Sequence, residues 1–321
     1  MWSHEVLGDE GDPRSVVGRQ LDFWRGRLAG APDVLALPTD RPRPPEADYT
    51  AETAELEISP ELHRALAGVA RKTQSSLFMV LQAGLSSLFT ALGAGEDIPI
   101  GSPIAGRNDK ALEGMIGFFV NTLVLRTDTS GAPTFRELLD RVREYDLAAY
   151  ANQDVPFERL VELLNPERSL AWHPLFQIWL NVQNLEAASS APVGLPGVEA
   201  AAHPVPVNAT QFDLAFTFNE STAPDGTPAG MQALIDFRLD LFDRATVEDL
   251  FRRLVRLLER VAADPELRVA DLPLLTDTEQ AVLAAANDTA RDLPPATFPE
   301  LYARRVAAAP TTSRWPSRAR S

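Results

Sequence analysis

One segment, Ser75–Leu92, reads SSLFMVLQAGLSSLFTAL and is apolar on nearly all of its sides. A helix that is hydrophobic all round is buried inside a protein. The chain has 321 residues, of which 45% are hydrophobic, so it can bury a sizeable core. We therefore predict a globular protein of one large domain or two lobes, with a buried helix over residues 75–92.

The rest of the chain carries both helical and strand-like patterns. Apolar residues recur at helical spacing over 16–28, 60–71, 135–151 and 243–263. Strands are predicted at 53–58, 98–105, 118–125, 175–182, 212–218 and 231–237, the last two joined as a hairpin by a turn rich in Pro and Gly. The four prolines of residues 37–48 predict an extended connector, and residues beyond 263 predict a linker with two short helical pieces.

Composition excludes several classes of function. The net charge is −15, and a field of that sign repels a phosphate backbone, which argues against nucleic-acid binding. There are no cysteines, and the four histidines are scattered, so no metal site is expected. No run approaches the roughly 20 apolar residues of a membrane helix, and the first residues lack the features of a signal peptide. We expect a cytoplasmic protein that binds no membrane.

Four motifs follow one another in the middle of the chain. They are DIPIGSPIAGR at 97–107, IGFFVNTLVLRTD at 116–128, NQDVPFERLVE at 152–162 and NPERSLAWHPLFQ at 165–177. In this order they resemble the condensation domains of non-ribosomal peptide synthetases, and the resemblance extends over roughly Val6–Asn287. It implies an α/β fold like that of chloramphenicol acetyltransferase, with two lobes in a V and a tunnel between them. This chain would be the C-terminal lobe, with helices packed on a mixed sheet.

The resemblance also implies an activity, an acyl transfer that forms an amide bond in secondary-metabolite biosynthesis. In the family, an amine on one carrier domain attacks a thioester on another, and each substrate arrives on a phosphopantetheine arm. No cofactor is implied on the domain itself. The family's chemistry centres on an HHxxxDG motif, and this sequence has no adjacent pair of histidines. We therefore expect the chain alone to be inactive, which leaves its standing as an enzyme open.

The resemblance predicts a domain layout as well. Residues 1–275 would be a partial condensation domain that lacks the N-terminal lobe, and residues 276–297 a linker. Residues 298–321 begin like an adenylation domain, with FPELYARRVAAAP at Phe298–Pro310, and end in an arginine-rich tail. That tail is interpreted either as a truncated or out-of-frame terminus or as a disordered basic segment.

Three asparagines are candidates for positioning a substrate in the tunnel. Asn181 and Asn184 end an apolar strand, and an amide can orient an amine or an oxyanion without titrating. A turn-forming role competes with that interpretation. Asn121 lies among apolar neighbours, where a hydrogen-bonded bracing role is favoured over substrate contact.

Other motif residues are interpreted as structural. Arg107 matches the arginine that in the family pairs with the aspartate of the histidine motif; here we expect it to face solvent or another carboxylate. Gln153, Asp154 and Phe157 belong to a turn that opens a helix, with Asp154 placed like a cap. Arg168 belongs to the NPERSLAWHPLFQ motif, and His173 precedes a proline at a strand entry, where we expect a hydrogen-bonded structural residue.

Three functions remain open. The first is a condensation-domain fragment that is inactive alone. The second is a split acyltransferase or docking module, completed in trans by a chain that supplies the histidine motif. The third is an epimerisation domain, which the adenylation-like segment disfavours. In each case the expected partners are carrier domains and adjoining synthetase domains.

Overall fold

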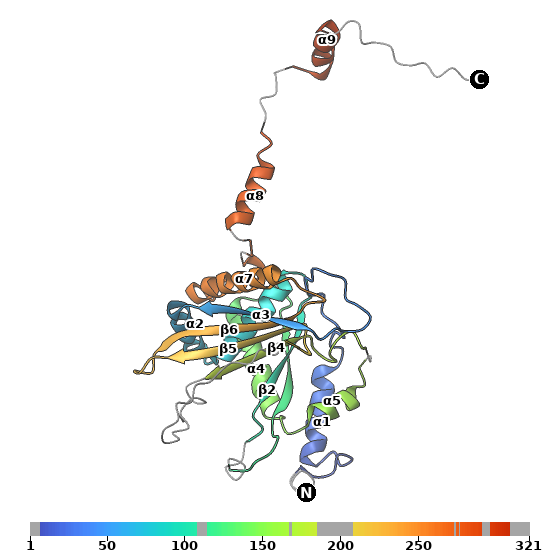
Figure 1. Ribbon diagram of the computed structural model, residues 1–321, viewed down its shortest axis with the longest axis vertical. Coiled ribbons are helices and arrows are strands. Elements are labelled where there is room, and N and C mark those ends of the chain that lie inside the picture. The colour runs from blue at the N-terminus through green and yellow to red at the C-terminus, as the bar shows by residue number, and fades with distance from the viewer. Residues whose placement is uncertain are drawn as a thin grey trace, which may run out of the picture. The chain divides into compact units, whose positions relative to one another are not determined.

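The core of the protein is a mixed β-sheet. The computed structural model describes residues 7–107, 114–166, 169–184, 208–272, 274–275, 277–290 and 296–308. Within them, six strands are ordered β1-β6-β5-β4-β2-β3 (Figure 1). Strand β4 is parallel to both β2 and β5, and the other neighbours are antiparallel. The strands are β1 (Ala51–Ile58), β2 (Asp97–Ile104), β3 (Asn121–Asp128), β4 (Ile178–Asn184), β5 (Leu214–Thr222) and β6 (Pro228–Arg238).

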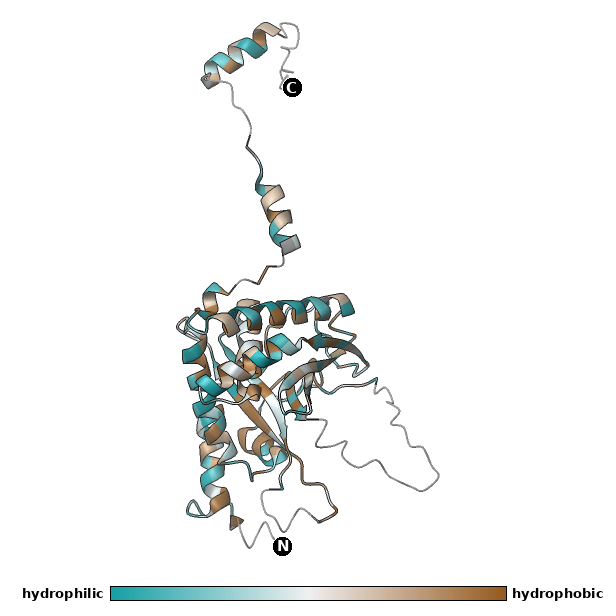
Figure 2. Cartoon of the chain, turned by 90° about the vertical axis from the view of Figure 1, so that its left-hand side faces the viewer, coloured by the Kyte–Doolittle hydropathy of each residue, from teal (hydrophilic) through white to brown (hydrophobic). Residues whose placement is uncertain are grey.

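Four helices pack with one face of the sheet into the main hydrophobic core (Figure 1). They are α2 (Pro60–Lys72), α3 (Leu77–Ala91), α4 (Phe135–Tyr150) and α7 (Arg244–Ala263). Every residue of α3 from Met79 to Phe89 is buried, which confirms the predicted buried helix. Helix α7 is amphipathic, with hydrophilic and hydrophobic residues alternating along it (Figure 2).

The helices begin where their capping residues predict. The Ser59 hydroxyl accepts a hydrogen bond from the Leu62 amide at 3.2 Å, and Pro60 occupies the first turn of α2. At α4, Thr134 and Glu137 form a capping box, in which each side chain accepts the other's backbone N–H. These caps satisfy amides that the first helical turn leaves without partners.

A second, smaller core lies at the β3 edge. Helices α1 (Val16–Leu28) and α5 (Phe157–Leu164) pack there against β3, with Trp24 fully buried. Arg126 on β3 ties this layer together, because its guanidinium bonds Asp97 on β2 and the carbonyls of Arg27 and Ala29 at the end of α1. A cation at a helix C-terminus satisfies carbonyls that have no partner within the helix.

Two strands begin three residues later than predicted. Strand β3 starts at Asn121, not at residue 118. Gly106 has φ +62 and its backbone lies so close to the Phe119 carbonyl that a Cβ would be 1.9 Å from that oxygen. This close approach keeps residues 118–120 in a loop, where Phe118 is 89% exposed. Strand β4 starts at Ile178 because Leu175, at φ +70, turns the chain just before it.

The chain divides into two compact units, Met1–Leu274 and Leu275–Ser321. The second unit contains α8 (Asp277–Asn287) and α9 (Phe298–Ala308), which match the two short helical pieces predicted beyond residue 263. In α9 the rings of Phe298 and Tyr302 stack at 6.4 Å and both are exposed. In neither unit does a described helix have the length and apolar character needed to span a bilayer.

Candidate functional site: the open face of the sheet

The candidate site is the face of the sheet that points away from the main core and its helices α2, α3, α4 and α7. Along β4, Ile178, Leu180 and Val182 join the main core. Side chains alternate between the two faces of a strand, so Trp179, Asn181 and Gln183 lie on the other face. On β5 the same alternation places Ala215, Thr217 and Asn219 there. We call this surface the open face.

At one end of the open face lies an aromatic cluster. The ring of Phe176 covers Gly101 on β2, where a Cβ would lie 2.1 Å from the ring. Only glycine leaves room for that ring. The rings of Trp179 and Phe212 stack next to it at 4.7 Å, with an interplanar angle of 6°. The aromatic cluster consists of Phe157, His173, Phe176, Trp179 and Phe212.

His173 is an uncharged member of this cluster. Its ring stacks on Phe157 at 5.5 Å and lies 4.4 Å from the ring of Phe176. Burial lowers the pKa of His173 to about 4. Its Nδ1 atom is buried and has no hydrogen-bond partner within the described part of the chain. A group with so low a pKa is a weak base at neutral pH, so the ring contributes packing rather than proton transfer. The sequence predicts a hydrogen-bonded structural residue, and the His173 backbone carbonyl accepts a bond of 3.1 Å from the Gln177 side chain.

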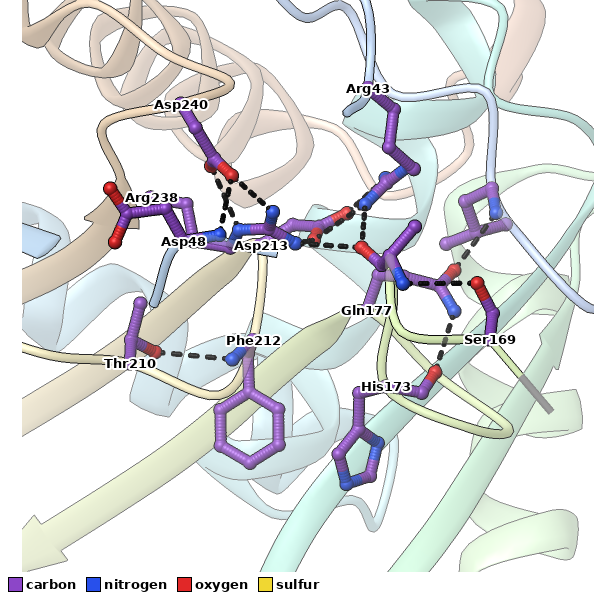
Figure 3. Close-up of polar contacts among 12 residues, drawn as sticks. Arg43, Asp48, Ser169, His173, Gln177, Thr210, Phe212, Asp213, Arg238 and Asp240 are labelled. Carbon is purple, nitrogen blue, oxygen red and sulfur yellow. Dashed lines mark hydrogen bonds and ion pairs between the residues drawn. The ribbon is translucent and has the colours of Figure 1, made fainter. Parts of the chain in front are cut away.

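A buried ionic network lies next to the aromatic cluster, as Figure 3 shows for Phe212 and His173. Arg238 donates to Asp213 at 3.2 Å and to Asp240 at 2.9 Å, and its side chain is 1% exposed. Arg43, from the proline-rich connector, donates to the same Asp213 oxygen, Oδ1, at 3.0 Å and also to Asp213 Oδ2. Both arginines also bond the Ala171 carbonyl. Because Asp213 follows Phe212 and Ala171 precedes the His173 turn, the network fixes two parts of the aromatic cluster.

Asn121 braces the turn that leads into the cluster. Its amide nitrogen donates to the Gln153 and Val155 carbonyls at 2.9 and 2.8 Å. Its oxygen accepts from the Phe157 amide at 3.0 Å and from the Thr122 amide at 2.9 Å. Both donors and both acceptor sites of the side chain are therefore used by backbone groups.

The turn residues differ in their local roles. Gln153 donates to the Tyr150 carbonyl at the end of α4. The cap of α5 is Pro156, not Asp154, so the cap predicted at Asp154 is wrong. Instead, the Asp154 carboxylate accepts a bond of 2.8 Å from Gln20, which also accepts from the Asp154 amide. The Asp154 side chain therefore pairs α1 with this turn.

The remaining candidates lie apart from the cluster or beyond the described residues. The Arg107 guanidinium lies 4.3 Å from the centre of the Phe119 ring and 3.5 Å from the Gly117 carbonyl oxygen. Asn181 is half-buried on the open face, and no hydrogen bond of its side chain to another described residue is found. Asn184 is the last residue of β4, paired with Glu220, and its side chain is outside the described part. Arg168 lies wholly outside the described residues.

The two histidines that the structure describes, His63 and His173, have different surroundings. His63 on α2 is 2% exposed; its Nδ1 accepts from the Gly230 amide at 3.2 Å and its Nε2 lies 3.5 Å from Glu220. His4 and His203 lie outside the described residues. Among the residues that the structure describes, no group of three or more His, Asp or Glu side chains is arranged to hold a metal ion.

Sequence reasoning missed most of the residues that build this site. The position of Trp179 on the open face could have been predicted, because side chains alternate along β4 and its neighbours Ile178 and Leu180 face the main core. The pairing of Asp213 with Arg238 joins residues 25 positions apart, and Arg43 is 170 positions from Asp213. Neither pairing leaves a local pattern, because both depend on the order of strands in the sheet.

Comparison with known proteins identifies the family. The condensation-domain family matches residues 14–284. A dimodular nonribosomal peptide synthase from Bacillus subtilis is 49% identical over 311 residues, which cover 97% of this chain and 13% of that protein. An isonitrile lipopeptide synthase from Mycobacterium tuberculosis is 39% identical over 317 residues, which cover 97% of this chain and 12% of that protein. This chain thus spans a small part of the length of both relatives.

Solved structures agree with the sequence matches. The X-domain from teicoplanin biosynthesis is 37% identical and superposes with a TM-score of 0.80, covering 85% of this chain and 61% of that one. A four-domain nonribosomal peptide synthetase, at 24% identity and a TM-score of 0.73, shares the fold. The mixed α/β fold expected from the resemblance is therefore confirmed. The chain belongs to the condensation-domain family of nonribosomal peptide synthetases.

Proposed function

We propose that this chain forms one wall of a condensation site, in which an amide bond is made between acyl groups carried as thioesters. Membership of the condensation family is the observation that supports this most directly. The catalytic histidines would come from residues outside this sequence, since the sequence contains no HHxxxDG. The chain is then the C-terminal part of the condensation domain and is inactive alone.

The open face suits the task of positioning more than that of proton transfer. Amide formation needs the amine held against the thioester and the developing oxyanion stabilised. The aromatic cluster offers apolar contact area for an acyl or aminoacyl chain, and Asn181 lies two residues beyond Trp179 on β4. Because burial lowers the pKa of His173 to about 4, His173 is a weak base and is not assigned the proton transfer.

The proposed partners are carrier domains, whose phosphopantetheine arms would deliver both substrates, together with the adjoining synthetase domains. We assign residues 1–275 to the condensation portion, 276–297 to a linker and 298–321 to the start of an adenylation-like segment. The division of the chain into units at Leu274 and Leu275 agrees with a boundary at this position.

A second candidate function is that of a docking module without its own chemistry. The observation that favours it is the similarity to the X-domain of teicoplanin biosynthesis, whose complex with OxyB superposes at a TM-score of 0.79. In that case a separate protein would bind the chain, and amide formation would not depend on it.

Reconstitution distinguishes the two. The chain is mixed with an aminoacyl donor and an acceptor on separate carrier domains, with and without the HHxxxDG-containing segment of the Bacillus subtilis relative. The proposal expects dipeptidyl carrier only when both polypeptides are present, detected by intact-protein mass spectrometry. Equal product without this chain would contradict the condensation role and leave the docking role.

A further inference from the structure

Two fully buried polar side chains meet between α3 and α4. Gln82 on α3 and Asp146 on α4 are both 0% exposed. Gln82 Nε2 donates to Asp146 Oδ1 and to Thr127 Oγ1 on β3, each at 3.2 Å. The carboxamide therefore uses both of its donors, and it joins two helices and a strand.

Each of these two side chains has one oxygen left over. Gln82 Oε1 and Asp146 Oδ2 are buried, and neither has a hydrogen-bond partner among the described residues. While Asp146 is ionised, both oxygens are acceptors and cannot satisfy each other. A proton on Oδ2 turns this atom into an O–H donor, for which Gln82 Oε1 is an acceptor. Because each oxygen shares a carbon atom with a partner of the Nε2–Oδ1 bond, that bond also brings the two oxygens near each other.

The charged groups on the neighbouring elements are engaged elsewhere. Helix α3 contains no charged residue. On β3, the Arg126 guanidinium pairs with Asp97 of β2, and Asp128 lies near Arg141 at the surface. An ionised carboxylate at position 146 would thus have no cation beside it within the part of the chain that the structure describes.

The charged groups of α4 itself do not balance Asp146 either. The titratable groups on which its charge acts are Tyr145 and Tyr150, whose pKa values are raised mainly by burial. None of the other charged residues of α4 is buried. Burial raises the pKa of Asp146 to about 7, so the carboxyl group keeps its proton in mildly acidic solution.

Asp146 lies one turn before the end of α4, where the turn into α5 begins. The Tyr150 carbonyl accepts a bond of 2.8 Å from the Gln153 side chain, and the Gln153 carbonyl accepts one of 2.9 Å from Asn121. Asn121 also holds the Phe157 amide at 3.0 Å. A change in the last turn of α4 can therefore reach Asn121 through two hydrogen bonds.

We propose that a proton on Asp146 Oδ2 closes a ring of two hydrogen bonds with Gln82 and makes the contact between α3 and α4 a pH-sensitive switch. When the pH rises, the proton leaves to solvent, the bond from Oδ2 to Oε1 breaks, and two buried oxygens face each other without a donor. The end of α4 then loosens, together with the turn that Asn121 braces. This inference concerns the fold of the chain and does not depend on the proposed function.

The test is a titration of the whole ¹⁵N-labelled chain from about pH 5 to about pH 8, followed through the side-chain amide signals of Gln82 and Asn121. We expect both signals to shift with a common midpoint near pH 7. Asp146→Asn should remove that midpoint, and Asp140→Asn, which changes an exposed carboxyl group of the same helix, should keep it. A Gln82 signal that does not shift, or the same midpoint in Asp146→Asn, overturns the inference; a still Asn121 signal contradicts the coupling to the turn.

A second measurement on the parent chain keeps the test valid if Asp146→Asn fails to fold. The carboxyl ¹³C signals of aspartate-labelled protein should include one that titrates near pH 7, with the same midpoint as the Gln82 amide, while exposed aspartates titrate near pH 4. If every aspartate titrates below about pH 5, no proton remains to close the ring near neutral pH and the inference is overturned.

Discussion

A buried carboxyl group should make the stability of this protein depend strongly on pH. Asp146 on α4 is fully buried, and Gln82 on α3 donates to it at 3.2 Å. Its other oxygen has no hydrogen-bond partner among the described residues. Helix α3 contains no charged residue. On β3, Thr127 bonds the same Gln82 amide, and Arg126 is engaged with Asp97. Among the described residues, no cation is therefore found to balance a charge on Asp146.

Burial raises the pKa of Asp146 to about 7, and the hydrogen bond from Gln82 offsets this only in part. Tyr150, one turn further along α4, is partly buried with a raised pKa and adds no positive charge. Between pH 4 and pH 7 the folded protein keeps a proton that the unfolded chain has released, so stability falls as the pH rises. Raising a carboxyl pKa from near 4 to about 7 corresponds to about 4 kcal/mol of stability lost once both states are ionised.

Urea unfolding of the parent chain and Asp146→Asn at pH 5, 6, 7 and 8 measures this loss. Between pH 5 and pH 8 the parent should lose about 3 kcal/mol more than the variant, since the neutral amide has no proton to release. Asp140→Asn, an exposed position on the same helix, is the control and should follow the parent. The reasoning is refuted if Asp146→Asn and the parent show the same pH dependence.

Three further predictions concern packing and surface. Gly101→Ala should destabilise the chain by about 1–3 kcal/mol in urea unfolding, because its Cβ would overlap the Phe176 ring. The control is Gly26→Ala on α1, where a Cβ meets nothing within 4 Å; a loss at Gly101 no larger than at Gly26 would contradict this. Asp213→Ala should lower the free energy of unfolding by about 2–3 kcal/mol in urea, because buried Arg238 keeps Asp240 but loses one of its two carboxylate partners. Asp243→Ala breaks an exposed pair with Arg41 and should cost less than about 1 kcal/mol; an equal loss in the two variants would contradict this. Ile116 and Phe118 are exposed apolar side chains, and such side chains favour self-association of the chain. The double variant Ile116→Ser with Phe118→Ser should therefore reduce self-association, measured by light scattering, without lowering the unfolding midpoint. Unchanged self-association would show that other surfaces cause it.

Local patterns predicted the elements well where one physical signal dominated. The apolar run at Ser75–Leu92 indicated α3, and Ser59 with Pro60 marked the start of α2. The β5–β6 hairpin followed from two alternating segments and the turn between them. In these cases the deciding interactions lie within a few residues of each other along the chain.

Long-range contacts explain what the sequence could not reveal. Residues 118–120 look like part of a strand, yet contact with Gly106 holds them in a loop. Asp154 has the local setting of a helix cap, but Gln20, 134 positions away, takes its carboxylate. Gln183, Asn219 and Gln232 are neighbours only because of the strand order, which no local pattern in the sequence predicts.

We propose that carrier-bound substrates contact the open face of the sheet. A carrier domain whose pantetheine arm ends in a photoreactive group, irradiated with the chain and the HHxxxDG-containing segment, tests this by peptide mapping of the adducts. We predict adducts on β4 and β5 at Trp179, Asn181, Gln183 or Thr217. Adducts confined to exposed residues of α2 and α7, on the opposite side of the sheet, would contradict the claim.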